Sequence, residues 1–178
     1  MSRGREYGAY ASELSITTFS RIFHGVFSRF LFPYSKQIDY DSSYNHIRQQ
    51  SLIAHGPMTP SESVASSAVK TAFDVKAKFI VVLTETGNSA RLIAKYRPSM
   101  PILTMTTNVE VARQCNGYMN SCHSELIPSM TGTDQILLHA IASGKKLGWC
   151  VAGDSVVCVH SSAEGTPGST NLLRVYTA

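Results

Sequence analysis

The sequence lacks a hydrophobic run long enough to cross a membrane, because its apolar stretches fall far short of the roughly 20 residues that a spanning helix needs. Its four cysteines form no Cys-x-x-Cys pair and have no histidine at zinc spacing. Cys158 alternates within an apolar strand pattern, which is typical of a small buried residue. These features favour a reducing compartment and predict neither a zinc site nor a membrane partner.

Acidic residues are also scarce. The 12 Asp and Glu residues face 16 Lys and Arg residues, for a net charge of +4, and the acids are scattered, so neither a carboxylate dyad nor a metal cluster is apparent. Residues 1–36 hold five basic and two acidic residues, whereas residues 37–178 hold eleven and ten. The globular part is therefore nearly neutral, and we expect no nucleic-acid partner.

No pairing of a nucleophile with a base stands out. The six histidines are scattered along the chain, and we expect each to be a surface or capping residue rather than a catalyst: His24, His46, His55, His123, His139 and His160. No catalytic residue and no metal ligand is therefore assigned.

Residues 1–37 differ in composition from the rest of the chain. Five of the seven phenylalanines lie there, and residues 16–31 place four of them near one face of an amphipathic helix. Arg and Ser enrichment is typical of a transit peptide, whereas Glu6 and Glu13 argue against one. An amphipathic or disordered leader, a targeting segment and a segment that is not natural coding sequence all stay open. We expect a cytoplasmic protein, with organellar targeting left open by this leader.

The remaining residues, 38–178, predict one α/β domain. A short polar helix is expected over residues 41–50, and Thr59, Pro60 and Glu62 form a helix start with a capping box. Strands are expected at residues 79–83, 101–106, 125–128, 155–160 and 172–176, with helices after the first three, the last of them capped by Thr133. This order predicts a three-layer sandwich with a mostly parallel five-stranded sheet, whose last strand is antiparallel.

The domain is organised around residues 79–98, a buried strand followed by a polar turn and a helix. The turn, called the first loop here, consists of Thr84, Glu85, Thr86, Gly87, Asn88 and Ser89. It should direct free backbone N–H groups and the positive end of a helix dipole at one point, which suits a phosphate or carboxylate. The alternative is that Thr86 or Ser89 merely caps the helix.

A second loop before the last strand has a similar composition: Gly165, Thr166, Pro167, Gly168, Ser169 and Thr170. Ligands of open α/β sheets bind outside the carboxyl ends of the strands, where both loops are expected to lie. Two Gly/Ser/Thr loops that face one crevice make a better anion site than either loop alone. We therefore predict an anion site built from both.

Several segments together resemble the C-terminal domain of pyruvate kinase. The resemblance runs through Ile38-Asp39-Tyr40, Ser66-Ser67-Ala68-Val69 and residues 80–90. Ala94-Lys95-Tyr96-Arg97-Pro98 followed by Pro101-Ile102 is close to the family's AKYRP…PI signature, and Ala112-Arg113-Gln114 and Gly153-Asp154 also fit. The likeness covers residues 38–178 and is greatest to the plant or protist cytosolic type.

The resemblance implies an α/β module that packs subunits into oligomers and binds a phosphorylated effector through the same two loops. Its expected partners are pyruvate kinase subunits or further copies of itself. Two departures argue against a bisphosphate sugar: Glu85 stands where animal forms carry a lysine, and Ile136 stands near a phosphate-binding arginine.

In the family, phosphoenolpyruvate, ADP, Mg²⁺ and K⁺ bind a catalytic barrel, which residues 1–36 do not resemble. We therefore expect this chain to need no cofactor and to be inactive alone. The competing hypothesis is an independent small α/β enzyme or phospho-ligand-binding protein that reuses the fold.

Overall fold

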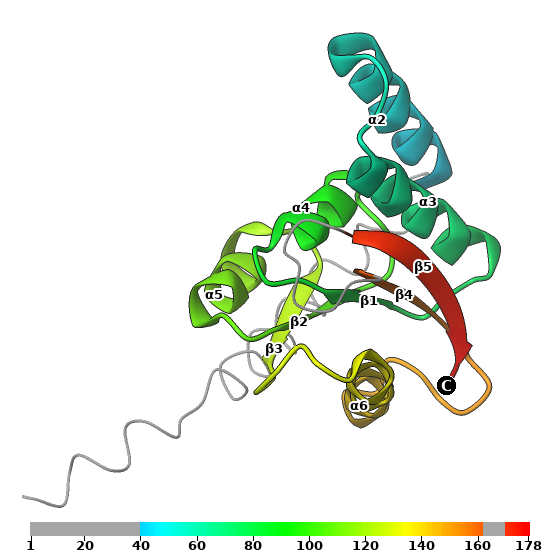
Figure 1. Cartoon of the computed structure of the whole chain (residues 1–178). Helices are drawn as coiled ribbons and strands as arrows, with labels where there is room; N and C mark the ends of the chain where they lie inside the picture. The colour runs from blue at the N-terminus through cyan, green and yellow to red at the C-terminus, as the bar shows by residue number, and fades with distance from the viewer. Residues whose placement is uncertain (1–39, 162–169) are drawn as a thin grey trace, which may run out of the picture. The chain divides into compact units, whose positions relative to one another are not determined.

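The computed structural model describes residues 40–161 and 170–178 (Figure 1). The predictions for the leader, residues 1–37, and for residues 165–169 of the second loop fall outside the described residues. Within the described part, no helix combines the length and apolar character needed to span a bilayer.

Helices and strands alternate through most of the chain. Their bounds are α2 (Tyr40–His55), α3 (Pro60–Asp74), β1 (Ile80–Leu83), α4 (Asn88–Lys95), β2 (Ile102–Thr106), α5 (Val109–Tyr118), β3 (Cys122–Leu126), α6 (Thr133–Lys146), β4 (Ser155–Ser161) and β5 (Thr170–Thr177).

The five strands form one sheet in the order β3-β2-β1-β4-β5. The first four strands are parallel, and β5 returns antiparallel to β4, as predicted. β1 lies at the centre, and all four of its residues are buried because helices cover both faces of a parallel sheet. Its carboxyl end therefore meets the ends of β2 and β4, which places the first loop in the middle of that edge.

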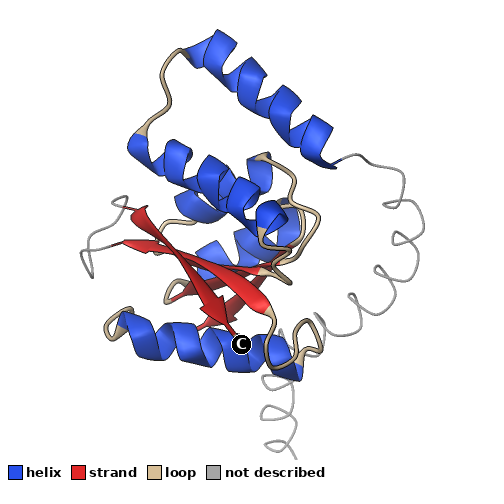
Figure 2. Cartoon of the chain, turned by 90° about the vertical axis from the view of Figure 1, so that its right-hand side faces the viewer, coloured by secondary structure: helices blue, strands red, loops and turns tan. Residues whose placement is uncertain are grey.

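The two faces of the sheet carry separate apolar layers. Side chains from α3, α4 and α5 pack on one face, against Ile80, Val82 and Ile102. On the other face α6 packs against Phe79, Val81 and Leu103. Figure 2 shows α6 on one side of the sheet and the other helices on the opposite side. The alternation of side chains along each strand thus produces the predicted three-layer sandwich.

The start of α3 shows how a local sequence signal gained a tertiary role. Thr59 caps the helix through its hydroxyl, which accepts a hydrogen bond from the Glu62 N–H at 3.3 Å, and Pro60 opens the helix. The Glu62 carboxylate accepts hydrogen bonds from Lys95 at 2.6 Å and from the Tyr96 hydroxyl at 3.1 Å, and thereby joins α3 to the end of α4.

Three further boundaries differ from prediction. α2 continues to His55, five residues beyond the expected end, and Ser51 is buried on its inner side. β3 begins at Cys122 rather than at residue 125. Its pairing with β2, and not the weak apolar pattern of its own sequence, determines where the strand begins. Gly132, in a left-handed conformation, is the N-cap of α6, so Thr133 is the first helical residue and not the cap.

Candidate functional site

The first loop leaves β1 at its carboxyl end and turns directly into α4. Thr84 is buried, and its hydroxyl accepts a hydrogen bond from the Gly87 N–H at 3.0 Å. Gly87 has φ +77°, a conformation that L side chains rarely adopt, and a β-carbon there would lie 3.2 Å from Cγ1 of Val111. The loop is therefore held in one tight shape between β1 and α5.

The two readings of this loop from sequence are both corrected in part. Gly87 is the N-cap of α4 and has no side chain with which to cap it, whereas the Thr86 hydroxyl accepts from the N–H of Asn88, the first residue of the helix, so Thr86 keeps part of the expected capping role and Ser89 lies inside the helix. However, two of the N–H groups expected to be free already have partners within the loop. Thr84 accepts from Gly87, and the Thr86 hydroxyl accepts from the Asn88 N–H at 3.5 Å. The loop offers an anion fewer donors than its composition predicts.

Ser89 and Thr170 connect the two loops. The hydroxyl oxygens of these residues lie 2.5 Å apart, both side chains are buried, and 81 residues separate them in sequence. Thr170 is the last residue of the second loop and the first residue of β5. Within the described residues, the first loop thus directly contacts the last residue of the second loop, at the edge where the two loops were expected to converge.

The two positions that argue against a bisphosphate also have defined places. Glu85 is half-buried within the first loop. Ile136 is buried in the first turn of α6, where it packs in the core layer beneath the sheet. A side chain at position 136 thus contributes to the core and supplies no charge.

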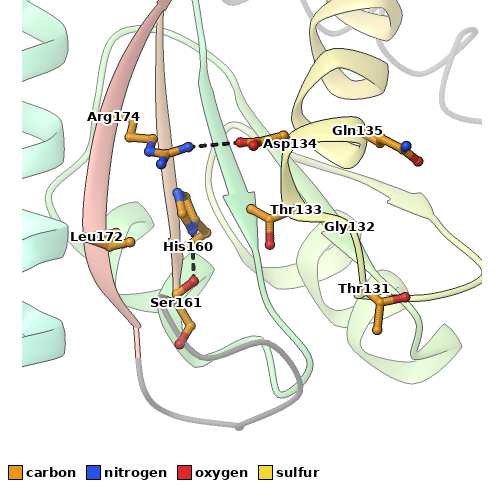
Figure 3. Close-up of a pocket in the computed structure, with 9 residues that line it drawn as sticks. All are labelled: Thr131, Gly132, Thr133, Asp134, Gln135, His160, Ser161, Leu172 and Arg174. Atoms are coloured by element: carbon orange, nitrogen blue, oxygen red, sulfur yellow. Dashed lines mark hydrogen bonds and ion pairs between the residues drawn. The ribbon is translucent and has the colours of Figure 1, made fainter.

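A pocket of about 610 Å³ opens between the N-terminus of α6 and the ends of β4 and β5 (Figure 3). The residues that line it come from those three elements and the turn before α6: Thr131, Gly132, Thr133, Asp134, Gln135, His160, Ser161, Leu172 and Arg174. The positive end of the α6 dipole therefore lies at this pocket.

His160 is the most unusual residue in this pocket. It is 4% exposed, which corrects the prediction of a surface or capping histidine. Its Nδ1 lies 2.9 Å from the Ser161 carbonyl oxygen, and because a carbonyl only accepts, Nδ1 carries the proton. Nε2 is buried without a hydrogen-bond partner among the described residues. Neutral His160 can thus accept a hydrogen bond from a hydroxyl, and protonated His160 can donate one to an anion.

The mouth of the pocket holds one ion pair. Arg174 donates to the Tyr176 hydroxyl at 3.1 Å and to the Asp134 carboxylate at 2.9 Å, and the contact with Tyr176, followed by that with Asp134, raises the pKa of Arg174 above its usual value. The ion pair is solvent-exposed, and exposed pairs contribute only about 0–1 kcal/mol. Arg174 can therefore turn towards an incoming anion at little cost.

The first loop and the pocket are linked through the pairing of β4 with β5, although α4 and α6 cover opposite faces of the sheet. Thr170, which contacts Ser89, pairs with Ser161 across β4 and β5. Ser161 follows His160 and lines the pocket. The backbone pairing of β4 with β5 thus connects the first loop to the pocket at the N-terminus of α6.

Sequence reasoning did not identify His160, Asp134 or Arg174 as site residues. The sequence analysis treated a histidine at the end of a strand as exposed, and the only available signal was that residue 160 lies at the carboxyl end of an apolar strand. Among the described residues, no three His, Cys, Asp or Glu side chains gather where they could hold a metal ion.

Comparison with known proteins agrees with the fold. Residues 62–176 match the family model of the pyruvate kinase alpha/beta domain. The chain is 39% identical over 150 residues to a pyruvate kinase of Eimeria tenella, a match that covers 84% of this chain and 28% of that protein. It is also 32% identical over 172 residues to the cytosolic isozyme of Nicotiana tabacum, with coverage of 86% and 32%.

Solved structures give the same result. The crystal structure of a pyruvate kinase from Cryptosporidium parvum superimposes with a TM-score of 0.72 at 33% identity, and the match covers 80% of this chain and 27% of that one. The chain thus spans about a quarter to a third of the length of these relatives. The family match, the sequence identity and the shared fold agree, and the chain belongs to the pyruvate kinase family through its α/β domain.

Proposed function

We propose that this chain supplies the regulatory and subunit-assembly module of a pyruvate kinase, a glycolytic enzyme that transfers phosphate from phosphoenolpyruvate to ADP. In this proposal the first and second loops hold the phosphate of a small effector. The observation that carries it is the contact between Ser89 and Thr170, because it brings the last residue of the second loop against the first loop at the carboxyl edge of the sheet.

The pocket beside the loops extends this ligand site. A sugar phosphate carries hydroxyl groups and a dianion, and both suit the pocket. Nε2 of His160 has no hydrogen-bond partner in the described part of the chain and can accept from a hydroxyl, while Arg174 lines the pocket as a cation. The ligand class that matches these groups is a phosphorylated polyhydroxyl compound.

Charge argues for one phosphate rather than two. Opposite charges at about 4 Å gain roughly 1 kcal/mol in water and about 4 kcal/mol at an effective dielectric constant near 20, and like charges lose as much. Glu85 in the first loop repels a phosphate on this scale, and Ile136 offers no compensating charge. We therefore expect weak binding of a single phosphate and poor binding of fructose-1,6-bisphosphate.

Calorimetric titration of the full chain with inorganic phosphate tests the site. Ser89→Ala should weaken binding by about tenfold, since one lost hydrogen bond near a charged group is worth about 1.5 kcal/mol. The matched control is Ser124→Ala, which also removes a hydroxyl hydrogen bond, to the Ala112 carbonyl at 2.8 Å, but on the edge strand β3. Equal affinity in both variants, or no binding by the unmodified chain, would refute the phosphate site.

Assembly is proposed to involve the outer edge of β5. β5 is the last strand of the sheet, and the side chain of Val175 on it is 48% exposed. An open strand edge is a template for pairing with another chain, and lysine on such an edge prevents pairing. Val175→Lys should therefore lower the oligomeric state measured by light scattering, whereas Leu138→Lys, at an exposed position on α6, should not.

A further inference from the structure

The sheet has a second outer edge, β3, which the proposed assembly through β5 does not use. In a parallel pair, successive residues direct their backbone N–H groups alternately towards the neighbouring strand and away from it. The N–H of Ile127, directly after β3, donates to the Thr106 carbonyl of β2 at 2.9 Å. Counted back from there, the residues of β3 that direct their N–H groups away from the sheet are Cys122, Ser124 and Leu126.

Two of these three outward N–H groups already have acceptors within the chain. The Ser124 N–H donates to Oδ1 of Asn116, on α5, at 2.9 Å, and the Cys122 N–H donates to the Met119 carbonyl at 3.4 Å. Asn116 itself is exposed. Its amide oxygen therefore occupies the position at which the carbonyl of a further strand would accept from Ser124, and the outer edge of β3 is closed at its centre.

The edge formed by β5 differs from that of β3. The Ala178 N–H donates to the Asp154 carbonyl, directly before β4, at 2.8 Å. Because N–H directions also alternate along an antiparallel strand, Val175 directs its N–H away from β4. In the part of the chain that the structure describes, no side chain accepts from this N–H. Of the two edges, β5 is thus the one that can accept a further strand.

We propose that Asn116 closes the β3 edge and thereby restricts the pairing of this chain with a second copy to β5. The inference rests on the proposed assembly through β5. An unpaired strand edge is a template for another chain, and native proteins cover or block such edges. A sheet with one open edge forms a closed pair of sheets, whereas a sheet with two open edges adds copies without limit. Asn116 thus ends the assembly of sheets at a pair.

Other contacts hold β3 in place when Asn116 is replaced. The Ser124 hydroxyl donates to the Ala112 carbonyl of α5 at 2.8 Å, and a carboxylate oxygen of Glu125 lies 2.6 Å from Nε2 of His139 on α6. Asn116→Ala therefore removes the acceptor at the edge and leaves the strand where it is. Alanine also has a higher helix propensity than asparagine, so α5 keeps its stability.

Light scattering of the full chain over a concentration series tests the closed edge. Asn116→Ala should raise the mean mass about twofold or more over the unmodified chain at the same concentration, since an opened edge joins at least two assemblies. The matched control is Asn120→Ala, which also removes an exposed amide that accepts one hydrogen bond, from the Ser121 hydroxyl at 3.3 Å, and should leave the mass unchanged. The thermal midpoint of each variant establishes that it is folded.

The Val175→Lys background separates this inference from the proposed assembly through β5. Asn116→Ala should raise the mass in that background too, because the β3 edge opens independently of β5. If Val175→Lys alone leaves the mass of the unmodified chain unchanged, the proposed pairing through β5 fails. A rise caused by Asn116→Ala in both backgrounds then still supports the closure of β3, whereas a mass equal to that of the parent chain at every concentration refutes it.

Hydrogen exchange shows whether the new contact lies at β3. The Ser124 N–H should exchange about fivefold faster in dilute Asn116→Ala than in the unmodified chain, the change expected for the loss of one hydrogen bond. Its exchange should slow again as the concentration rises, because the strand of a second copy takes the place of Asn116. Unchanged exchange in the dilute variant, or a higher mass without renewed protection of Ser124, would overturn the proposal.

Discussion

Gly144 provides the sharpest test of how α6 packs on the sheet. It lies in the last turn of α6 and faces Phe79, the residue before β1, and a β-carbon there would lie 2.5 Å from Cζ and 2.7 Å from Cε1 of Phe79. Both separations are far below carbon–carbon contact distance. Phe79 cannot simply swing away, because it is fully buried and its ring packs edge-on against Trp149 at a centroid distance of 5.7 Å.

The expected magnitude for Gly144→Ala has two opposing parts. Overpacking of a core costs about 1–3 kcal/mol, and two contacts this short place the cost near about 3 kcal/mol. Replacing a helical glycine by alanine returns at most about 1 kcal/mol of helix propensity, the value for a helix interior. The net loss of unfolding free energy is therefore about 2 kcal/mol. For a chain of 178 residues, this lowers the thermal midpoint by about 4–8 °C.

Gly117 is the matched control. It lies in α5, and a β-carbon there would meet no atom within 4 Å. Gly117→Ala should therefore keep only the propensity gain of about 0.5–1 kcal/mol and raise the midpoint by about 1–4 °C. Calorimetric melting of both variants gives the comparison, and opposite signs are the expected result. If Gly144→Ala raises the midpoint as Gly117→Ala does, the close packing of α6 on Phe79 is wrong. The double variant with Phe79→Leu should recover part of the loss.

Three further predictions concern single side chains. Glu85→Lys should strengthen inorganic phosphate binding measured by calorimetry, because it replaces a repulsion by an attraction, and unchanged affinity would show that the first loop is not the site. The Lys95 hydrogen bond lowers the pKa of Glu62, so this pair should stabilise the fold above about pH 4.5 and lose that contribution as the pH falls through the lowered value. Glu62→Gln should flatten the acid limb of a stability–pH curve, and an unaltered curve would contradict this assignment. Thr59→Ala should remove the N-cap of α3 and cost about 1 kcal/mol in chemical denaturation, whereas no loss would mean that the cap is dispensable.

The parts of the fold that could be predicted from sequence are those with strong local signals. β1 is a continuous apolar run, Thr59 and Pro60 mark a helix start, and Asn108, a residue type typical of N-caps, caps α5 through bonds to two N–H groups. β3 has no such signal, because only its first residue is buried and the rest are partly or fully exposed. Its position depends on hydrogen bonds to β2, which no local pattern encodes.

The candidate site likewise has parts that could be predicted from sequence and parts that could not. The first loop could be located because it follows a recognisable strand, and its meeting with the second loop follows from the rule that parallel strands present their carboxyl ends at one edge. The hydrogen bonds within the loop could not be predicted, since a threonine may cap, turn or bind. The burial of His160 depends on α6 and β5 closing over it, and these elements are distant in sequence from each other.

β5 connects the two halves of the proposed function. Its first residue, Thr170, contacts the first loop; Leu172 and Arg174 line the pocket; and Val175 is exposed on the same strand. A ligand that orders the start of β5 also orders the edge at which another subunit is proposed to pair. Thermodynamic linkage then requires that pairing strengthen ligand binding by the same factor as the ligand strengthens pairing. Val175→Lys should therefore weaken phosphate binding, although Val175 lies outside the pocket lining. If this variant and the unmodified chain bind phosphate with equal affinity, subunit pairing and ligand binding are independent of each other.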